Sequence, residues 1–405
     1  MKPLEGIKVV DFTRVLAGPT CTRVLVELGA TVTKIEPPAG DVARNAGPFV
    51  DDECGYFLQL NGGKRNISID LNYPEARDIV FGLCARADVI VENFRPGTMR
   101  SFGLEYARVA AANPGVVYVS ISGYGQESPW SGRPAFAPTV QAESGMTTSS
   151  LAHYGQKLTE PAADAGSHAD LYTGYQGAIA ALAGLNRRAR TGRGTHADVS
   201  MMATMLAVNE RAHAQLNEMD SYGEPLALSA PESPIFTLAD GSMVTIAASP
   251  VWSGAFQRYC TMMGRNDLKL DPRFETAEKR RSNVDALLAE VQAWIHSFRS
   301  IEELEAQVSA GGRLAVGRLR SALDVLDTEW AQAAEPTYAV NVGEHAIKLP
   351  KAPWLFDGVD SGALPRAAAQ GQHNRDVLLE CGLDEQAIDA LAKAGVLHGG
   401  AGAKA

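Results

Sequence analysis

The first half of this chain alternates short runs of β-branched residues with longer amphipathic runs. This pattern predicts strands at 7–12, 31–35, 67–71, 89–92 and 116–122, and helices at 19–28, 74–87 and 105–112. Strands that alternate with helices form parallel βαβ units, which wind into a Rossmann-like sheet. Such sheets bind ligands beyond the carboxyl ends of their strands. The sequence therefore predicts an α/β fold with its site at that edge.

The loop that follows the first predicted strand excludes the commonest ligands of such a sheet. It runs from Thr13 to Pro19 without the glycine spacing that admits a pyrophosphate. The chain also has no P-loop. These absences argue against a nicotinamide or flavin dehydrogenase and against a reaction driven by ATP.

The chain is long enough for two or three domains, and its pattern changes after about residue 200. We expect a large Rossmann-like domain over 1–200, a helical connector over 201–227 and a small α+β domain over 228–325. The last segment, 326–405, is expected to return to the large domain. Within the small domain, two β-rich runs flank the turn at 239–242 and predict a hairpin. Further helices are predicted at 284–298 and 385–394.

The composition limits the partners. A formal net charge of -10 and a pI near 5.4 argue against nucleic acid. No apolar run approaches the roughly 18 to 20 residues that cross a bilayer, and the N-terminus does not resemble a signal peptide. We therefore expect a cytoplasmic protein without a membrane partner. Its 5 cysteines are scattered and its histidines lack partner spacing, so no metal site is predicted.

Asp170 is the candidate catalytic residue, and it stands at the start of a predicted alanine-rich helix. On the local sequence alone, an aspartate there is more often a helix N-cap. His168, two residues earlier, is a candidate base beside it, although a structural histidine is the more common finding. The remainder of the chain decides between these interpretations.

Motifs that favour a catalytic Asp170 occur in a fixed order along nearly the whole sequence. Before Asp170 they include Leu4 to Thr13, Ala17-Gly18-Pro19, Leu28 to Glu36, Ala87 to Gly97 and Ser120 to Gly125. After it come Thr191 to Ser200 and the segment from Gly371 to Leu383. In this order and spacing, the sequence resembles CoA-transferase family III.

The resemblance implies a mechanism and a set of contacts with coenzyme A. Asp170 matches the family's nucleophile, which carries the acyl group as an anhydride and CoA as an aspartyl thioester. No cofactor is bound permanently, and acyl-CoA is a substrate. The implied CoA contacts are Leu16, Ala17, Ile69, Asp70, Leu71, Asn72, Asn93, Phe94, Arg95, Ala135, Phe136 and Ala137, with Arg44 and Arg100 as phosphate ligands.

The resemblance also implies an assembly. The large domain is built from both chain ends around the inserted small domain, and two subunits interlock as a homodimer. The active site then lies between the large domain of one subunit and the small domain of the other.

Three functions stay open. The first is transfer of CoA from a donor such as succinyl-CoA or acetyl-CoA to a carboxylic acid, for which mesaconate, itaconate and citramalate are examples. The second is 2-methylacyl-CoA racemisation, but Phe136 stands where the racemase has a histidine, and a phenyl ring carries no proton. The third is CoA binding without catalysis. Formyl-CoA transfer is disfavoured because Leu16 replaces that branch's glutamine.

Overall fold

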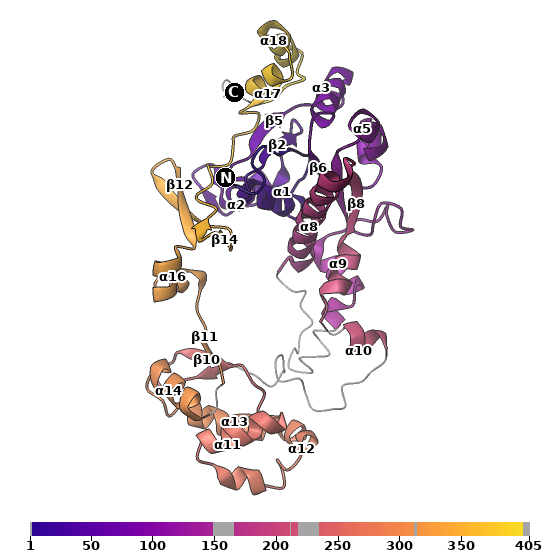
Figure 1. The fold of residues 1–405 in the computed structure, drawn as a ribbon. Coiled ribbons are helices and arrows are strands. Elements are labelled where there is room, and N and C mark those ends of the chain that lie inside the picture. Colours follow the sequence, from indigo (N-terminus) through magenta and orange to yellow (C-terminus); the bar gives the residue numbers. More distant parts are fainter. Residues whose placement is uncertain (1, 149–165, 211, 218–234, 312–313, 400–405) are drawn as a thin grey trace. The chain divides into compact units, whose positions relative to one another are not determined.

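The computed structural model describes residues 2–148, 166–210, 212–217, 235–311 and 314–399. These residues form two compact units (Figure 1). The first unit holds the described residues of 1–147, 163–209 and 335–405, and the second holds those of 148–162 and 210–334. Residues 218–234, where the expected connector meets the expected small domain, lie outside the description.

A six-stranded sheet forms the centre of the first unit. Its strands are β1 (Lys8–Asp11), β2 (Thr31–Glu36), β5 (Arg65–Ser68), β6 (Val89–Glu92), β7 (Val117–Ser122) and β8 (Thr195–Ser200). They lie in the order β5-β2-β1-β6-β7-β8, and every neighbouring pair is parallel. The prediction of a parallel α/β sheet is confirmed. The strand order reverses between β1 and β6, and a doubly wound sheet offers its ligand crevice at such a switch point.

Helices bury both faces of this sheet. On one face, α1 (Ala17–Glu27) and α8 (His168–Thr191) share a core with side chains such as Val9 and Val119. On the other face, α3 (Pro74–Cys84), α5 (Tyr106–Ala112), α17 (Asn374–Glu380) and α18 (Glu385–Lys393) share a core with Val10 and Tyr118. Adjacent residues of one strand thus enter opposite cores, which is why the central strands β1, β6 and β7 are mostly apolar.

Shorter elements complete the first unit. They are η1 (Val42–Asn45), β3 (Phe49–Val50), β4 (Glu53–Cys54), α2 (Gly55–Asn61), α4 (Thr98–Ser101), α6 (Ala137–Glu143), α9 (Met201–Val208), β12 (Thr337–Val342), β13 (His345–Pro350), β14 (Leu355–Phe356) and β15 (Val359–Asp360). In Figure 1, α17 lies beside β5, and α18 lies next to α17. The N–H of His373 bonds to the carbonyl of Asn66 at 2.9 Å, so the C-terminal segment covers this edge of the sheet.

One strand prediction needs correction, and the sequence patterns missed β8 and one hairpin. The strand expected at 67–71 ends at Ser68, because its partner β2 ends at Glu36 and the next residue, Pro37, has no N–H to donate. Strand β8 was not predicted, since its polar sequence lacks the apolar run of the other strands. The antiparallel hairpin of β12 and β13 was also missed.

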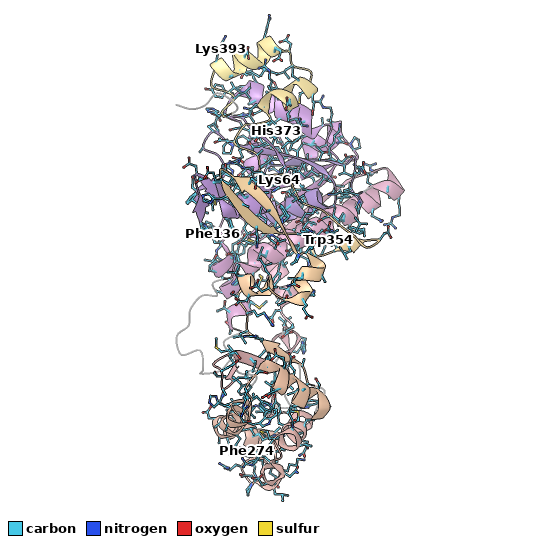
Figure 2. The ribbon with its side chains drawn as sticks, turned by 90° about the vertical axis from the view of Figure 1, so that its left-hand side faces the viewer. Lys64, Phe136, Phe274, Trp354, His373 and Lys393 are labelled. Carbon is cyan, nitrogen blue, oxygen red and sulfur yellow. The ribbon has the colours of Figure 1, made fainter. Side chains whose placement is uncertain are left out.

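The second unit combines helices with a small antiparallel sheet. Its elements are α10 (Ala212–Leu216), β9 (Phe236–Thr237), β10 (Met243–Ile246), α11 (Ser253–Met262), η3 (Asn266–Leu270), α12 (Ala277–Ser282), α13 (Val284–Ile295), α14 (Ile301–Gly311), β11 (Val316–Arg318), α15 (Ala322–Val325) and α16 (Glu329–Ala334). The predicted hairpin is confirmed, because β9 pairs antiparallel with β10. Phe274 is among its fully buried side chains (Figure 2). In the described part of the chain, no helix has both the length and the hydrophobicity to span a membrane.

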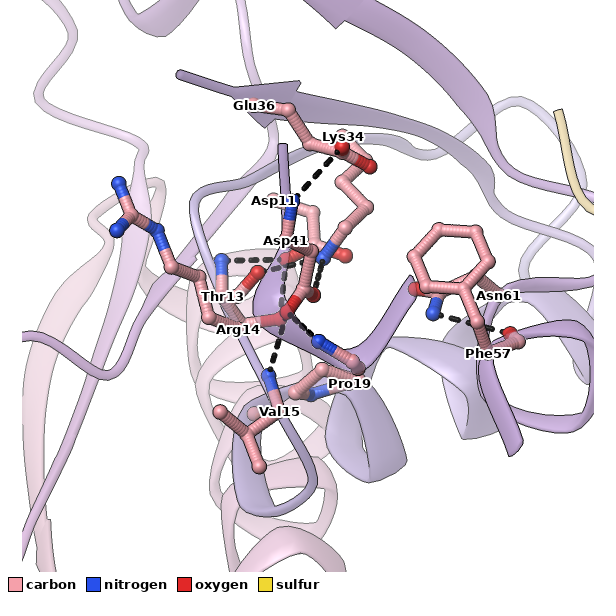
Figure 3. Close-up of polar contacts among 12 residues, drawn as sticks. Asp11, Thr13, Arg14, Val15, Pro19, Lys34, Glu36, Asp41, Phe57 and Asn61 are labelled. Atoms are coloured by element: carbon pink, nitrogen blue, oxygen red, sulfur yellow. Dashed lines mark hydrogen bonds and ion pairs between the residues drawn. The ribbon is translucent and has the colours of Figure 1, made fainter. Parts of the chain in front are cut away.

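Two buried ion pairs lie where β1 ends, and Figure 3 labels both residues of one of them, Lys34 and Asp41. Lys64 lies 3.2 Å from the Asp11 carboxylate, and Lys34 lies 3.0 Å from Asp41. Lys34 also donates to the carbonyl of Thr13 at 2.5 Å. Burial lowers the pKa of Lys64 to about 8, although the charge of Asp11 acts to raise it. Lys64 lies inside the first unit, and these charges fix the loop after β1 (Figure 2).

Removing one of these buried charges is expected to destabilise the protein strongly. The substitution Lys64→Met leaves the buried Asp11 carboxylate without its ion-pair partner, which costs about 3–5 kcal/mol of unfolding free energy. Chemical denaturation measures it. The control is Glu380→Ala, which breaks an exposed ion pair with Arg65 and should cost about 1 kcal/mol or less. Equal losses in the two variants would show that the buried pair does not hold this loop.

Candidate active site

The loops that follow β1 and β6 are joined at the switch point of the sheet. The backbone N–H of Arg14 donates to Asn93 Oδ1 at 2.9 Å, and Asn93 Nδ2 donates back to the Arg14 carbonyl at 2.9 Å. The Arg14 guanidinium lies 5.0 Å from the centre of the Phe94 ring. Asn93 thus joins the two loops, which places the side chains of Arg14 and Phe94 next to each other.

Val15 has a strained backbone in this loop. Its φ of 66° is in the left-handed region, where a β-branched residue is a genuine outlier. The carboxylate of Asp41 holds the strained amide through a bond of 3.1 Å to the Val15 N–H. Strain of this kind costs about 1–3 kcal/mol and persists only where the surroundings enforce it, commonly at functional sites. Here it directs the chain into α1.

Asp170 lies in the first turn of α8. Ser167 occupies the N-cap position, so Asp170 is not the cap of its helix. One turn later, Gly174 touches α1: an added Cβ would lie 2.5 Å from the Ala17 carbonyl oxygen and 2.7 Å from Thr20 Cβ. Only a residue without a side chain allows this approach. It brings the Asp170 carboxylate to the backbone N–H of Ala17, the first residue of α1, as a hydrogen-bond acceptor.

The environment of Asp170 perturbs its ionisation. Burial raises its pKa to about 6, and the hydrogen bond from Ala17 opposes that rise. The pKa of Tyr56 rises to about 12, first through burial and then through the negative charge of Asp170. Tyr56 on α2 therefore lies within electrostatic reach of the carboxylate. At neutral pH Asp170 is mostly ionised, yet largely removed from water.

Helix α6 supports the same turn of α8. Buried Gln141 accepts the N–H of Ala169 at 3.1 Å, directly before Asp170. Phe136 is the N-cap of α6, and 68% of its surface is exposed. The His168 ring stacks with Tyr172, their centres 5.7 Å apart.

The structure places several expected CoA contacts at one edge of the sheet. Leu16 and Ala17 begin α1 beside Asp170, and 93–95 directly follow β6. The turn at 69–72 follows β5, where Arg77 Nε donates to the Leu71 carbonyl at 2.7 Å. The Arg77 guanidinium in turn lies 5.9 Å from the Phe102 ring, next to α4, and so links this turn with the helix that carries Arg100.

The two expected phosphate ligands differ in their surroundings. Arg44 makes two hydrogen bonds of 2.9 Å to the carboxylate of Glu36 and lies over the Phe57 ring. Arg100 and Arg95 are exposed. Arg44 is therefore already bound to Glu36, with which a phosphate would have to compete.

The sequence did not single out Arg14, Tyr56 and Gln141 as site residues. Arg14 stands two residues after the predicted end of the first strand, which was a usable signal. Its Nε is buried without a hydrogen-bond partner among the described residues, and burial lowers the pKa of the guanidinium. Tyr56 and Gln141 reach the site only through tertiary packing. No cluster of metal-ligating side chains occurs in the described ranges.

Comparisons with known proteins identify a family with this fold. Residues 4–374 match the model of CoA-transferase family III. A succinyl-CoA:mesaconate CoA-transferase of Haloarcula hispanica is 34% identical over 81% of this chain and 83% of its own. A succinyl-CoA:glutarate CoA-transferase of Mus musculus is 32% identical over 98% of this chain and 91% of its own. The crystal structure of a CAIB/BAIF family protein from Brucella suis superimposes with a TM-score of 0.77 at 30% identity, over 94% of this chain and 99% of that one.

The contact between α1 and α8 gives a test with a matched control. Gly174→Ala places a methyl group against the Ala17 carbonyl, so we expect a loss of about 1–3 kcal/mol in unfolding free energy and displacement of Asp170. In Gly82→Ala, also within a helix, the methyl group meets no atom within 4 Å. That variant should be neutral or about 1 kcal/mol more stable. Similar stabilities for both variants would mean that close approach does not position α8.

Proposed function

Because this chain belongs to CoA-transferase family III, we propose that it moves CoA from an acyl-CoA donor to a carboxylic acid through covalent intermediates on Asp170. One observation carries the proposal. Asp170 is a half-buried carboxylate held against the start of α1, beside the switch point of a parallel sheet.

Four acyl transfers account for the exchange. An Asp170 oxygen attacks the thioester carbonyl and the C–S bond breaks. CoA departs as a thiolate, and a mixed anhydride remains on the aspartate. The thiolate then attacks the Asp170 carbonyl, which releases the donor acid and forms an aspartyl thioester. The acceptor carboxylate attacks that thioester, CoA thiolate leaves again, and a mixed anhydride of Asp170 and the acceptor forms. Its final attack on the acceptor's carbonyl forms the new acyl-CoA and restores Asp170.

The start of α1 offers stabilisation for these steps. The N–H groups of Ala17 and Gly18 are in its first turn, where the helix dipole is positive and favours negative charge. Pro19 follows and has no N–H that needs a partner. In each tetrahedral intermediate, the oxygen of the attacked carbonyl, either that of the acyl group or that of the Asp170 side chain, carries a negative charge. Preorganised N–H donors are the usual means of stabilising such an oxyanion. Burial also protects the anhydride from hydrolysis.

We assign CoA binding to the loops around the switch point. Leu16, Ala17, the segments 69–72, 93–95 and 135–137, and Arg100 and Arg44 retain the roles implied by the resemblance. Arg14 is added because its guanidinium lies over Phe94 with its Nε unsatisfied. An arginine with free donors suits phosphate, which accepts charge-assisted hydrogen bonds.

The relatives support a choice of substrates. The names of the enzymes from Haloarcula hispanica and Mus musculus give succinyl-CoA as donor and a dicarboxylic acid, mesaconate or glutarate, as acceptor. We propose succinyl-CoA and a small dicarboxylic acid for this chain. The racemase alternative is weaker because Phe136 has no proton to exchange and the His168 ring stacks with Tyr172.

We further propose that the enzyme is an interlocked homodimer whose site needs the small domain of the second subunit. An apolar stripe on the outer face of α8 supports a protein partner beside Asp170. It consists of Tyr172, Tyr175 and Ile179, which are 40%, 50% and 56% exposed. Large apolar side chains in a contiguous stripe are typical of interfaces.

Removal of the nucleophile is expected to abolish transfer. Asp170→Ala and the nearly isosteric Asp170→Asn should both lower the rate of succinyl-CoA-dependent CoA transfer by at least about a thousandfold. A panel of dicarboxylic acids, analysed by liquid chromatography, measures it. As a control, Asp376→Asn changes an exposed aspartate in the first turn of α17 and should leave the rate unchanged. Transfer by either Asp170 variant at the wild-type rate would refute the proposal.

The rate should also depend on the ionisation of Asp170. Only the carboxylate attacks, and its pKa is raised to about 6 by burial. We therefore expect kcat/KM to be constant above about pH 7 and to fall tenfold per pH unit below about pH 5. A profile that is flat down to about pH 4 would contradict an ionisation of this kind.

The dimer has a separate test. Gel filtration with light scattering should show that transfer activity coincides with a particle of twice the chain mass. A fully active monomer would rule out a site shared by two subunits.

A further inference from the structure

A chain of hydrogen bonds crosses three strands on the sheet face opposite α8. Glu92 ends β6, is 3% exposed, and accepts the N–H of Phe94 at 2.9 Å. Ser120 lies opposite it in the β6–β7 register and also bonds to its carboxylate. The Ser120 hydroxyl lies 2.9 Å from Nε2 of His196, which is exposed on the edge strand β8. A buried carboxyl is thus connected to the surface.

We propose that Glu92 is a positioning residue for the CoA-binding loop of Asn93 and Phe94, and that Ser120 and His196 carry its proton to solvent. The part that concerns CoA rests on the function proposed above. Two hydrogen bonds connect Glu92 to the neighbouring loop that contains Arg14. Glu92 holds the Phe94 amide, and Asn93 holds the backbone of Arg14 in the neighbouring loop.

The groups around Glu92 bring its ionisation close to neutral pH. Burial raises its pKa to about 7, and the charge of Asp198 on β8 adds to the rise. The hydrogen bonds from Ser120 and Phe94 oppose it. Other titratable groups on this face include Tyr118 on β7, Cys84 on α3, Tyr106 stacked on His196, Glu105 before α5, and Glu127, whose charge acts on His196.

The relay conserves protons. When Glu92 is protonated, its O–H donates to Ser120 Oγ, and the serine O–H donates to Nε2 of a His196 that carries its proton on Nδ1. Two transfers along these bonds ionise Glu92 and leave His196 with protons on both nitrogens. His196 then releases the Nδ1 proton to water. In the resulting state, Nε2–H donates to Ser120, and Ser120 donates to the carboxylate.

Ionisation of Glu92 is expected to strengthen its hydrogen bond to the Phe94 N–H and so to hold the loop of Asn93 and Phe94 more firmly. A carboxylate accepts the Phe94 N–H in a charge-assisted hydrogen bond, which is about twice as strong as a neutral one. CoA should therefore bind about threefold to tenfold more tightly when Glu92 is ionised, which is the range that one such bond supplies. The affinity should rise as the pH passes through about 7.

The first experiment follows the protonation of Glu92 in the full chain, by infrared titration of its carboxyl band between about pH 5 and about pH 9. An Asp170→Asn background removes the titration of Asp170. We expect a band with a midpoint near pH 7 that is absent after Glu92→Gln. Ser120→Ala removes a donor to the carboxylate and should raise the midpoint by about one pH unit. His196→Phe keeps an aromatic ring beside Tyr106, but should slow deprotonation after a pH jump about a hundredfold.

The second experiment measures the dissociation constant of CoA by calorimetry in the same background. It should fall about threefold to tenfold from about pH 6 to about pH 8, and the change should disappear in Glu92→Gln. Persistence of the pH dependence in that variant, or no infrared band near pH 7, would overturn the inference. If Glu92→Gln does not fold, the midpoint shift of Ser120→Ala decides. Failure to bind CoA at any pH would count against the proposed function, while the infrared titration still tests the relay.

Discussion

The ion pair between Asp11 and Lys64 is the interaction on which the site depends. Asp11 ends the strand at the sheet's switch point, and the N–H of Thr13 bonds to its carboxylate at 2.8 Å. Burial alone would raise its pKa, but the charges of Lys64 and Lys34, together with hydrogen bonds from Thr13 and Thr22, outweigh burial and lower it. The loop is thereby fixed by charges in the interior, where hydrogen-bonded partners are essential. A dinucleotide-binding sheet uses glycines at this place instead.

From this anchor, the structure leads to Asp170 in three steps. Asp41, paired with Lys34, holds Val15 in its strained conformation. The strained loop fixes the start of α1. The first turn of α8 then packs against the start of α1, because Gly174 has no side chain to separate the two helices. The result is a carboxylate whose pKa is raised by burial and whose orientation is fixed for nucleophilic attack.

The sequence predicted the features that local patterning encodes. Strands buried on both faces are apolar runs, so five of the six were recognisable, whereas polar β8 is a strand only because β7 pairs with it. Asp170 was identified through motif order, and its place in the first turn of a helix followed from the alanine-rich run. Packing determined the rest: Tyr56 and Gln141 come from other elements, and Glu36 binds the arginine expected to hold phosphate.

The most direct test of covalent transfer at Asp170 is mass spectrometry of the protein incubated with succinyl-CoA and hydroxylamine. An activated aspartyl carbonyl, whether anhydride or thioester, reacts with hydroxylamine to give a stable hydroxamate before any acceptor is known. The account predicts this modification on the peptide that contains Asp170, and its loss in Asp170→Asn. An unmodified Asp170 across a series of acyl-CoA donors, in protein shown to bind CoA, would contradict the central claim.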